Sequence, residues 1–62
     1  MLVIIYTNYL VMTYDIVFQG TKEELAKALD EGPVLLSIRG GGQVYINSIN
    51  ATAIEIKDSP LT

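Results

Sequence analysis

The sequence lacks cysteine, histidine and tryptophan altogether. Without cysteine the chain cannot be held together by disulfides, and without cysteine or histidine it lacks the usual ligands of a structural zinc site. A single domain of 62 residues is marginal as a monomer, because small chains bury too little surface without disulfides, metals or self-association. Self-association is the support that remains. We therefore expect one domain over residues 1–62 that forms a homodimer or a higher homo-oligomer.

Positive charge is also scarce. Four Lys and Arg residues stand against seven Asp and Glu residues, and the formal net charge is −3. A basic footprint for a phosphate backbone is missing, and a net negative charge repels nucleic acid. The composition therefore disfavours nucleic acid as a partner and is compatible with a basic patch on a partner protein.

No run of apolar residues is long enough to cross a membrane. The uncharged N-terminal stretch ends at Asp15 and already contains Thr7 and Asn8, whereas a spanning helix needs about 20 apolar residues. A basic start and a small-residue cleavage site, as in a secretory signal, are absent. These features predict no membrane partner and a cytoplasmic location.

Residues 2–6 are mostly β-branched or aromatic, which is typical of a strand. They are apolar on both faces, so both faces of the strand should be shielded from water by other residues. A second copy of the chain can shield the face that its own core does not reach. We accordingly predict a dimer interface made of the residues of this strand: Leu2, Val3, Ile4, Ile5 and Tyr6. The alternative is that the natural start is Met12 and that residues 1–11 are an apolar extension without a function.

The middle of the chain predicts a strand followed by a helix. From Met12 to Gln19 apolar and polar residues alternate, as in a half-buried strand. Thr21 and Glu24 then form the pattern of a capping box. Leu25, Ala28 and Leu29 line one face of a helix over residues 22–31, and Gly32 fits the left-handed position that ends it.

The remaining residues predict three further strands. Residues 34–38 and 43–47 flank the glycine-rich turn 39–42 and form a hairpin, and residues 52–57 form a last strand that completes an antiparallel meander. Residues 58–62 are expected to be a frayed tail. The fold class is therefore α+β: a small antiparallel β-sheet of four to five strands in the order β-α-β-β-β, with residues 2–6 as an extra N-terminal strand and one helix packed on one face.

Catalytic patterns are missing. The acidic pairs at the two helix ends are adjacent in sequence, so their carboxylates do not face each other. The loop Gly40–Gly42 joins two strands instead of opening a helix, and no Lys-Ser/Thr pair follows it, so it does not read as a phosphate loop. The serines have no histidine to activate them. We expect no enzyme activity, no catalytic residue, no cofactor and no metal site.

A binding role remains, and Arg39, Gln43 and Tyr45 are the predicted contacts with a partner, since Arg and Tyr are favoured at binding hot spots. The strand Thr13–Phe18, the segment Gly20–Leu25 and the closing hairpin with Val44–Asn47 resemble the small acidic accessory proteins encoded by phages and prophages. In size and form the chain is similar to the phage anti-defence group that includes the Hachiman anti-defence protein. This resemblance implies a homodimer that binds and inhibits a bacterial defence protein in the host cytoplasm.

Two alternatives remain open. One is a structural subunit of a phage particle or assembly. The other is a weak nucleic-acid or nucleotide binder that would use Arg39, the glycine loop and a tyrosine.

Overall fold

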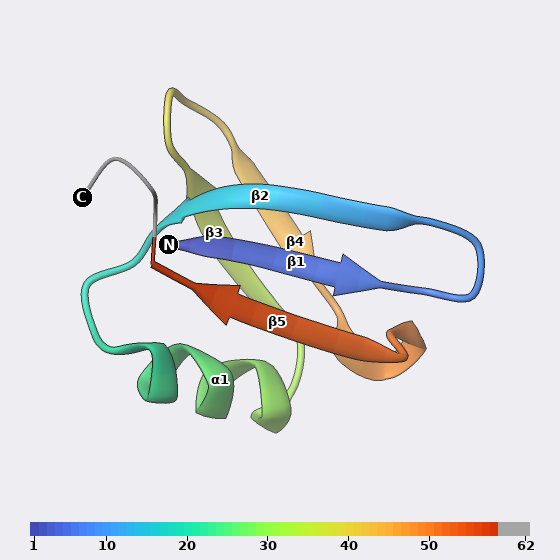
Figure 1. The fold of residues 1–62 in the computed structure, drawn as a ribbon. Coiled ribbons are helices and arrows are strands. Elements are labelled where there is room, and N and C mark those ends of the chain that lie inside the picture. The colour runs from blue at the N-terminus through green and yellow to red at the C-terminus, as the bar shows by residue number, and fades with distance from the viewer. Residues whose placement is uncertain (59–62) are drawn as a thin grey trace.

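The computed structural model describes residues 1–58, and over this range it confirms the predicted α+β class (Figure 1). The elements are β1 (Leu2–Tyr6), β2 (Val11–Val17), α1 (Lys22–Glu31), β3 (Val34–Ile38), β4 (Gln43–Ile46), the 3-10 turn η1 (Ser48–Asn50) and β5 (Ala53–Lys57). The predicted tail lies outside the described residues except for Asp58, which pairs with Lys22 at 3.7 Å.

The N-terminal strand is a central member of the sheet. The strand order is β4-β3-β2-β1-β5, and each neighbouring pair is antiparallel. Within β1, Ile4 lies opposite Thr13 of β2 and Glu55 of β5. A chain beginning at Met12 would lack the strand that joins β2 to β5, so residues 1–11 are not an extension without a role in the fold.

The predicted meander of the last three strands is wrong. The hairpin of β3 and β4 is present, but β5 pairs with β1 instead of β4. The turn η1 carries the chain from β4 to the far edge of the sheet. The physical reason lies in β1, because a strand made of apolar residues is more stable in the centre of a sheet, paired on both edges, than at its edge. β2 pairs with one edge of β1, and β5 pairs with the other.

The sheet bends into two layers that share β2. This strand pairs with β1 from Val11 to Asp15 but with β3 only at Ile16 and Val17. Figure 1 shows β3 and β4 crossing behind β5, β1 and β2, with α1 alongside β5. We call β5, β1 and β2 the front layer and β3 with β4 the back layer; a strand that changes sheets at a bend is typical of such crossed packing.

The core lies between the two layers and is closed by α1. Alternate residues of the strands point inward, as the strand period of two requires. The buried residues are Val3, Ile5, Ile16, Leu25, Leu29, Leu36 and Ile46. The helix contributes only one stripe, because Leu25 and Leu29 are four residues apart and lie on the same face.

The helix has the predicted bounds and the predicted start. The Glu24 amide donates to Thr21 Oγ1 at 3.1 Å, and the Thr21 amide donates to Glu24 Oε1 at 3.0 Å, so the capping box is complete. The end differs from the prediction. Gly32 has φ 149° and ψ −171°, which is an extended conformation of positive φ and not the left-handed helical one.

The turn between β3 and β4 depends on its glycines. Gly40, Gly41 and Gly42 have φ values of 93°, 122° and 88°, a region that side-chain-bearing residues rarely adopt. The Ile38 amide donates to the Gly42 carbonyl at 3.0 Å, and the Gly41 amide donates to the Ile38 carbonyl at 3.1 Å. The predicted role of this loop as a hairpin turn is confirmed.

Candidate protein-binding surfaces

The outer face of the front layer is a sheet face that α1 does not cover. The helix lies at the β5 side of this layer (Figure 1), and its buried leucines pack into the core. The register places Leu2, Ile4 and Tyr6 of β1 on this outer face, beside Val11 and Thr13 of β2 and beside Ala53 of β5. We call these six residues, with the charged residues on the same face, the front face. It has an apolar centre, and Val11 is 58% exposed.

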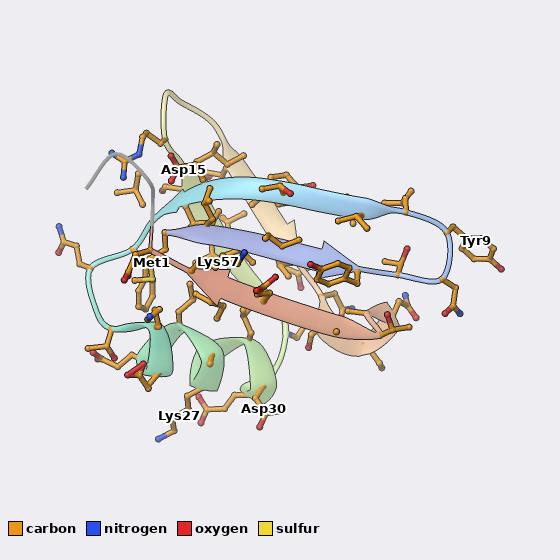
Figure 2. The ribbon with its side chains drawn as sticks, viewed as in Figure 1. Met1, Tyr9, Asp15, Lys27, Asp30 and Lys57 are labelled. Carbon is orange, nitrogen blue, oxygen red and sulfur yellow. The ribbon has the colours of Figure 1, made fainter. Side chains whose placement is uncertain are left out.

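The charges on the β5 side of the front face neutralise each other. Lys57 Nζ lies 3.5 Å from Glu55 Oε2, and Figure 2 shows the Lys57 side chain lying over the face of the sheet. The Tyr6 hydroxyl donates to Glu55 Oε1 at 3.1 Å. This hydrogen bond to a carboxylate raises the pKa of Tyr6 above its ordinary 10.0.

A second group of paired charges lies on the β2 side of the front face and is centred on Asp15. Asp15 Oδ2 accepts a hydrogen bond from Arg39 Nε at 3.0 Å, and Asp15 Oδ1 lies 3.6 Å from the Met1 amino group. The Arg39 amide also donates to the Asp15 carbonyl at 2.8 Å. Asp15 thus fastens the end of β3 and the start of β1 to β2, where pairing between the two layers is short.

The tip of the β1–β2 hairpin extends the apolar surface beyond the sheet. Thr7 closes the turn: its amide donates to the Leu10 carbonyl at 2.9 Å, and its Oγ1 accepts from the amides of Tyr9 and Leu10. This local bonding holds Tyr9 outward, and its side chain is 93% exposed (Figure 2). Leu10 is 51% exposed.

The three predicted partner contacts lie on one face, the outer face of the back layer. Gln43 pairs with Ser37, and Tyr45 pairs with Leu35. Arg39 follows Ile38 and has the same parity as these β3 residues, which places it on their face. Tyr45 is 65% exposed and Leu35 is 56% exposed. We call the outer-facing residues Leu35, Ser37, Arg39, Gln43 and Tyr45 the back face.

The structure divides the predicted dimer residues into two sets. Val3 and Ile5 are enclosed in the core of their own chain, with 0% and 6% of their surface exposed. Their side chains are therefore not available to a partner, and the predicted interface is narrowed to Leu2, Ile4 and Tyr6. Val11, which lies opposite Tyr6 on the same face, was not among the predicted residues, because the sequence alone did not reveal the register of β2 against β1.

Within residues 1–58, no three acidic side chains come together as a metal-binding group. In the same range no helix has both the length and the apolar character needed to span a membrane. No protein-family model, curated protein or solved structure matches the chain.

Proposed function

We propose that this protein is a non-enzymatic protein-binding module that pairs with a second copy through its front face and contacts a partner protein through its back face. The observation that carries the proposal is the uncovered front face, where Leu2, Ile4 and Tyr6 of the central strand are backed by their own core on one side only. Leu2, Ile4 and Tyr6 are half-buried, and Val11 beside them is exposed. A contiguous apolar surface that stays open to solvent marks interaction sites on small proteins.

Self-pairing suits the front face because of its charge. Each chain has a net charge of −3, so two copies repel each other unless the touching surfaces are locally neutral. On the front face Glu55 is matched by Lys57, and Asp15 is matched by Arg39 and the Met1 amine. A symmetric pair places the same patch against itself, so an internally neutral patch avoids like-charge contacts.

The size of the contact indicates how much surface must take part. A standard interface buries about 800 Å² per partner, which is about a fifth of the chain's 4291 Å² of accessible surface. The three short strands of the front layer are a small platform for such an area. We therefore include the hairpin tip, with Tyr9 and Leu10, in the proposed interface.

The back face stays available when the front faces are joined. Both layers contribute their inner faces to one core, so their outer faces point in different directions. Tyr45 and Leu35 then offer an aromatic and an aliphatic contact to a second protein. Arg39, whose guanidinium is paired with Asp15 at 3.0 Å, lies beside them on the side of the back face nearest to β2. The likeness in size and form to phage anti-defence proteins directs the search for that protein to bacterial defence proteins, with inhibition as the proposed outcome.

The pairing is tested by light scattering on the wild type and on Ile4→Lys. The new lysine lies opposite Glu55 on the neighbouring strand, so within one chain the substitution adds an attractive cross-strand pair. In the proposed dimer interface, it places one additional cation from each copy against the other. The matched control is Ile49→Lys, because Ile49 lies on η1 and is 79% exposed. We expect dimeric mass for the wild type and the control and monomeric mass for Ile4→Lys. A monomeric wild type at all concentrations would overturn the pairing.

The partner role is tested in cells that carry a Hachiman-type defence system. Expression of the wild-type chain should restore plaque formation by a phage that the system blocks, and Tyr45→Lys should remove this effect while keeping the dimeric mass. Ile49→Lys again serves as the control. Unchanged defence in cells that contain the soluble wild-type protein would count against this class of partner.

A further inference from the structure

A groove runs between α1 and the outer edge of β5; it is separate from the back face and shares only Ala53 with the front face. A hollow of about 320 Å³ is lined by residues of α1, η1 and β5, and a second hollow continues from it toward Lys22 and Glu23. The two hollows share Ala26, Ile54 and Ile56. Small side chains keep this groove open: Ala26 lies on the helix side, and Ala51 and Ala53 lie at its other end.

The edge of β5 along this groove has no strand beside it in the part of the chain that the structure describes. Within residues 1–58, β5 pairs with β1 only, and it is the last strand of the sheet. Every second amide and carbonyl of an edge strand points away from its neighbour and can pair with another chain. The groove therefore combines unpaired backbone groups with an apolar floor, which is the arrangement used for strand addition by extended peptides.

The rim of the groove is acidic. Glu23 lies at the start of α1 and Asp30 near its end, and both line the hollows. Neither carboxylate takes part in an ion pair within residues 1–58. Lys22, the one cation among the described residues that line the groove, is already paired with Asp58 at 3.7 Å. A cationic side chain of an incoming peptide can therefore find a carboxylate at each end.

We infer that this groove binds an extended basic peptide of a partner protein by adding it as a sixth strand next to β5. A second copy of this chain is a poorer occupant, because its net charge is −3 and it would approach two uncompensated carboxylates. The front face shows the opposite pattern, since its charges are internally paired. The two sites therefore differ in the chemistry of what they bind.

The geometry of the groove defines the peptide. Glu23 and Asp30 are seven residues apart on α1, which is about 10 Å along the helix axis. Residues i, i+2 and i+4 of a strand share one face and span about 13 Å. Lysines at i and i+4 reach the two carboxylates by small side-chain adjustments, and an aliphatic residue at i+2 faces Ala26, Ile54 and Ile56. Lys22 at the start of α1 lies 3.7 Å from Asp58, which follows the end of β5. The two elements therefore run in opposite directions, as Figure 1 shows.

The probe is the capped peptide Thr-Lys-Thr-Val-Thr-Lys-Thr, added to the full chain and followed by amide chemical shifts. We expect saturable shifts at β5 and at Ala26, and no binding of the same peptide with both lysines replaced by glutamate. A peptide with N-methylated amides at the β5-facing positions should also fail, because strand addition needs those donors. Shifts at β2 or the back face without shifts at Ala26, Ile54 and Ile56 of the groove, or equal binding of the glutamate peptide, would overturn the inference.

Two protein variants test the groove itself. Glu23→Gln combined with Asp30→Asn should weaken the lysine peptide by about fivefold, the value expected from losing two exposed ion pairs. Ala26→Gln should fill the groove, whereas Lys27→Gln serves as the control, since Lys27 is exposed and lines neither hollow. Unchanged affinity in Ala26→Gln would contradict the proposed position of the peptide.

The readouts keep this inference separate from the proposed pairing. If the groove residues Ala26 and Asp30 of α1 shift on raising the protein concentration without peptide, a second copy occupies the groove and the peptide assignment is wrong. Concentration-dependent shifts confined to β1, β2 and the β5 residues of the front face report the proposed pairing instead. If Ile4→Lys becomes monomeric and still binds the peptide, both proposals stand. If it remains dimeric while the peptide binds, only the front-face pairing fails.

Discussion

The two neighbouring isoleucines of β1 provide the sharpest test of how the structure uses this strand. Ile5 faces the core opposite Met12 and Ile54, and it is 6% exposed. Ile4 faces outward opposite Thr13 and Glu55. The same substitution, isoleucine to alanine, therefore removes the same atoms from opposite faces of one strand.

The expected losses differ in size and in their dependence on concentration. Ile5→Ala leaves a cavity in the core and should cost about 2–5 kcal/mol of unfolding free energy. A chain of 62 residues has a total stability of about 3–9 kcal/mol at the usual value per residue. Ile5→Ala should therefore remove much of the stability and lower Tm by at least about 8 °C. Ile4→Ala should cost about 1 kcal/mol or less within a single chain.

The assay is urea unfolding followed by circular dichroism at two protein concentrations that differ by about tenfold, a factor that shifts a pairing equilibrium by roughly 1.4 kcal/mol. The Ile5→Ala loss should be the same at both concentrations, since it arises within one core. Any additional loss in Ile4→Ala should shrink on dilution, because it arises from the pair. Equal losses for both variants at both concentrations would refute the assignment of the two faces of β1.

Three further outcomes follow from individual contacts. Thr21→Ala removes the capping box and should lower the unfolding free energy by about 1 kcal/mol in denaturant titrations. Adding Glu24→Ala to this variant should lower the unfolding free energy little further, because the two side chains form the capping box together. Gly41→Ala should destabilise by about 1–2 kcal/mol: no atom lies within 4 Å of an added Cβ, so the cost arises from the φ of 122° alone, and unfolding of Ser37→Ala provides a comparison on the same hairpin. The Tyr6 pKa is raised by its hydrogen bond to Glu55, so the stability that it contributes is complete below pH 10.0 and is lost as pH rises through the folded-state pKa. In tyrosinate absorbance, the Tyr6 component, identified as the one lost in Tyr6→Phe, should titrate at lower pH in Glu55→Gln than in the wild type.

Local patterns of the sequence predicted the elements well. The helix from Lys22 to Glu31 and its capping box follow from Thr21 and Glu24, and the hairpin follows from three glycines between two apolar runs. Such features depend on residues that are close in sequence, so their signals can be read locally.

The position of β5 could not be predicted in this way. The segment before it is short, and short connections usually join neighbouring strands. The pairing of β5 with β1 connects residues about fifty positions apart and depends on the need of β1 for a second neighbour. The division of β1 into Val3 and Ile5 on the core side and Leu2, Ile4 and Tyr6 outside has the same origin, because all five residues are apolar in composition and only the register separates them.

The pairing of charges suits the front face and the groove to different proposed partners. On the front face, Glu55 and Asp15 already have cations beside them, so an apolar surface of the same kind can approach without leaving a buried charge uncompensated. At the groove, Glu23 and Asp30 have no ion pair within residues 1–58, and a partner that brings lysine or arginine gains attraction that a second acidic copy cannot offer. The proposed self-pairing and the proposed binding of a basic segment are therefore compatible in one small chain, because the two contacts share only Ala53 and require opposite electrostatic conditions.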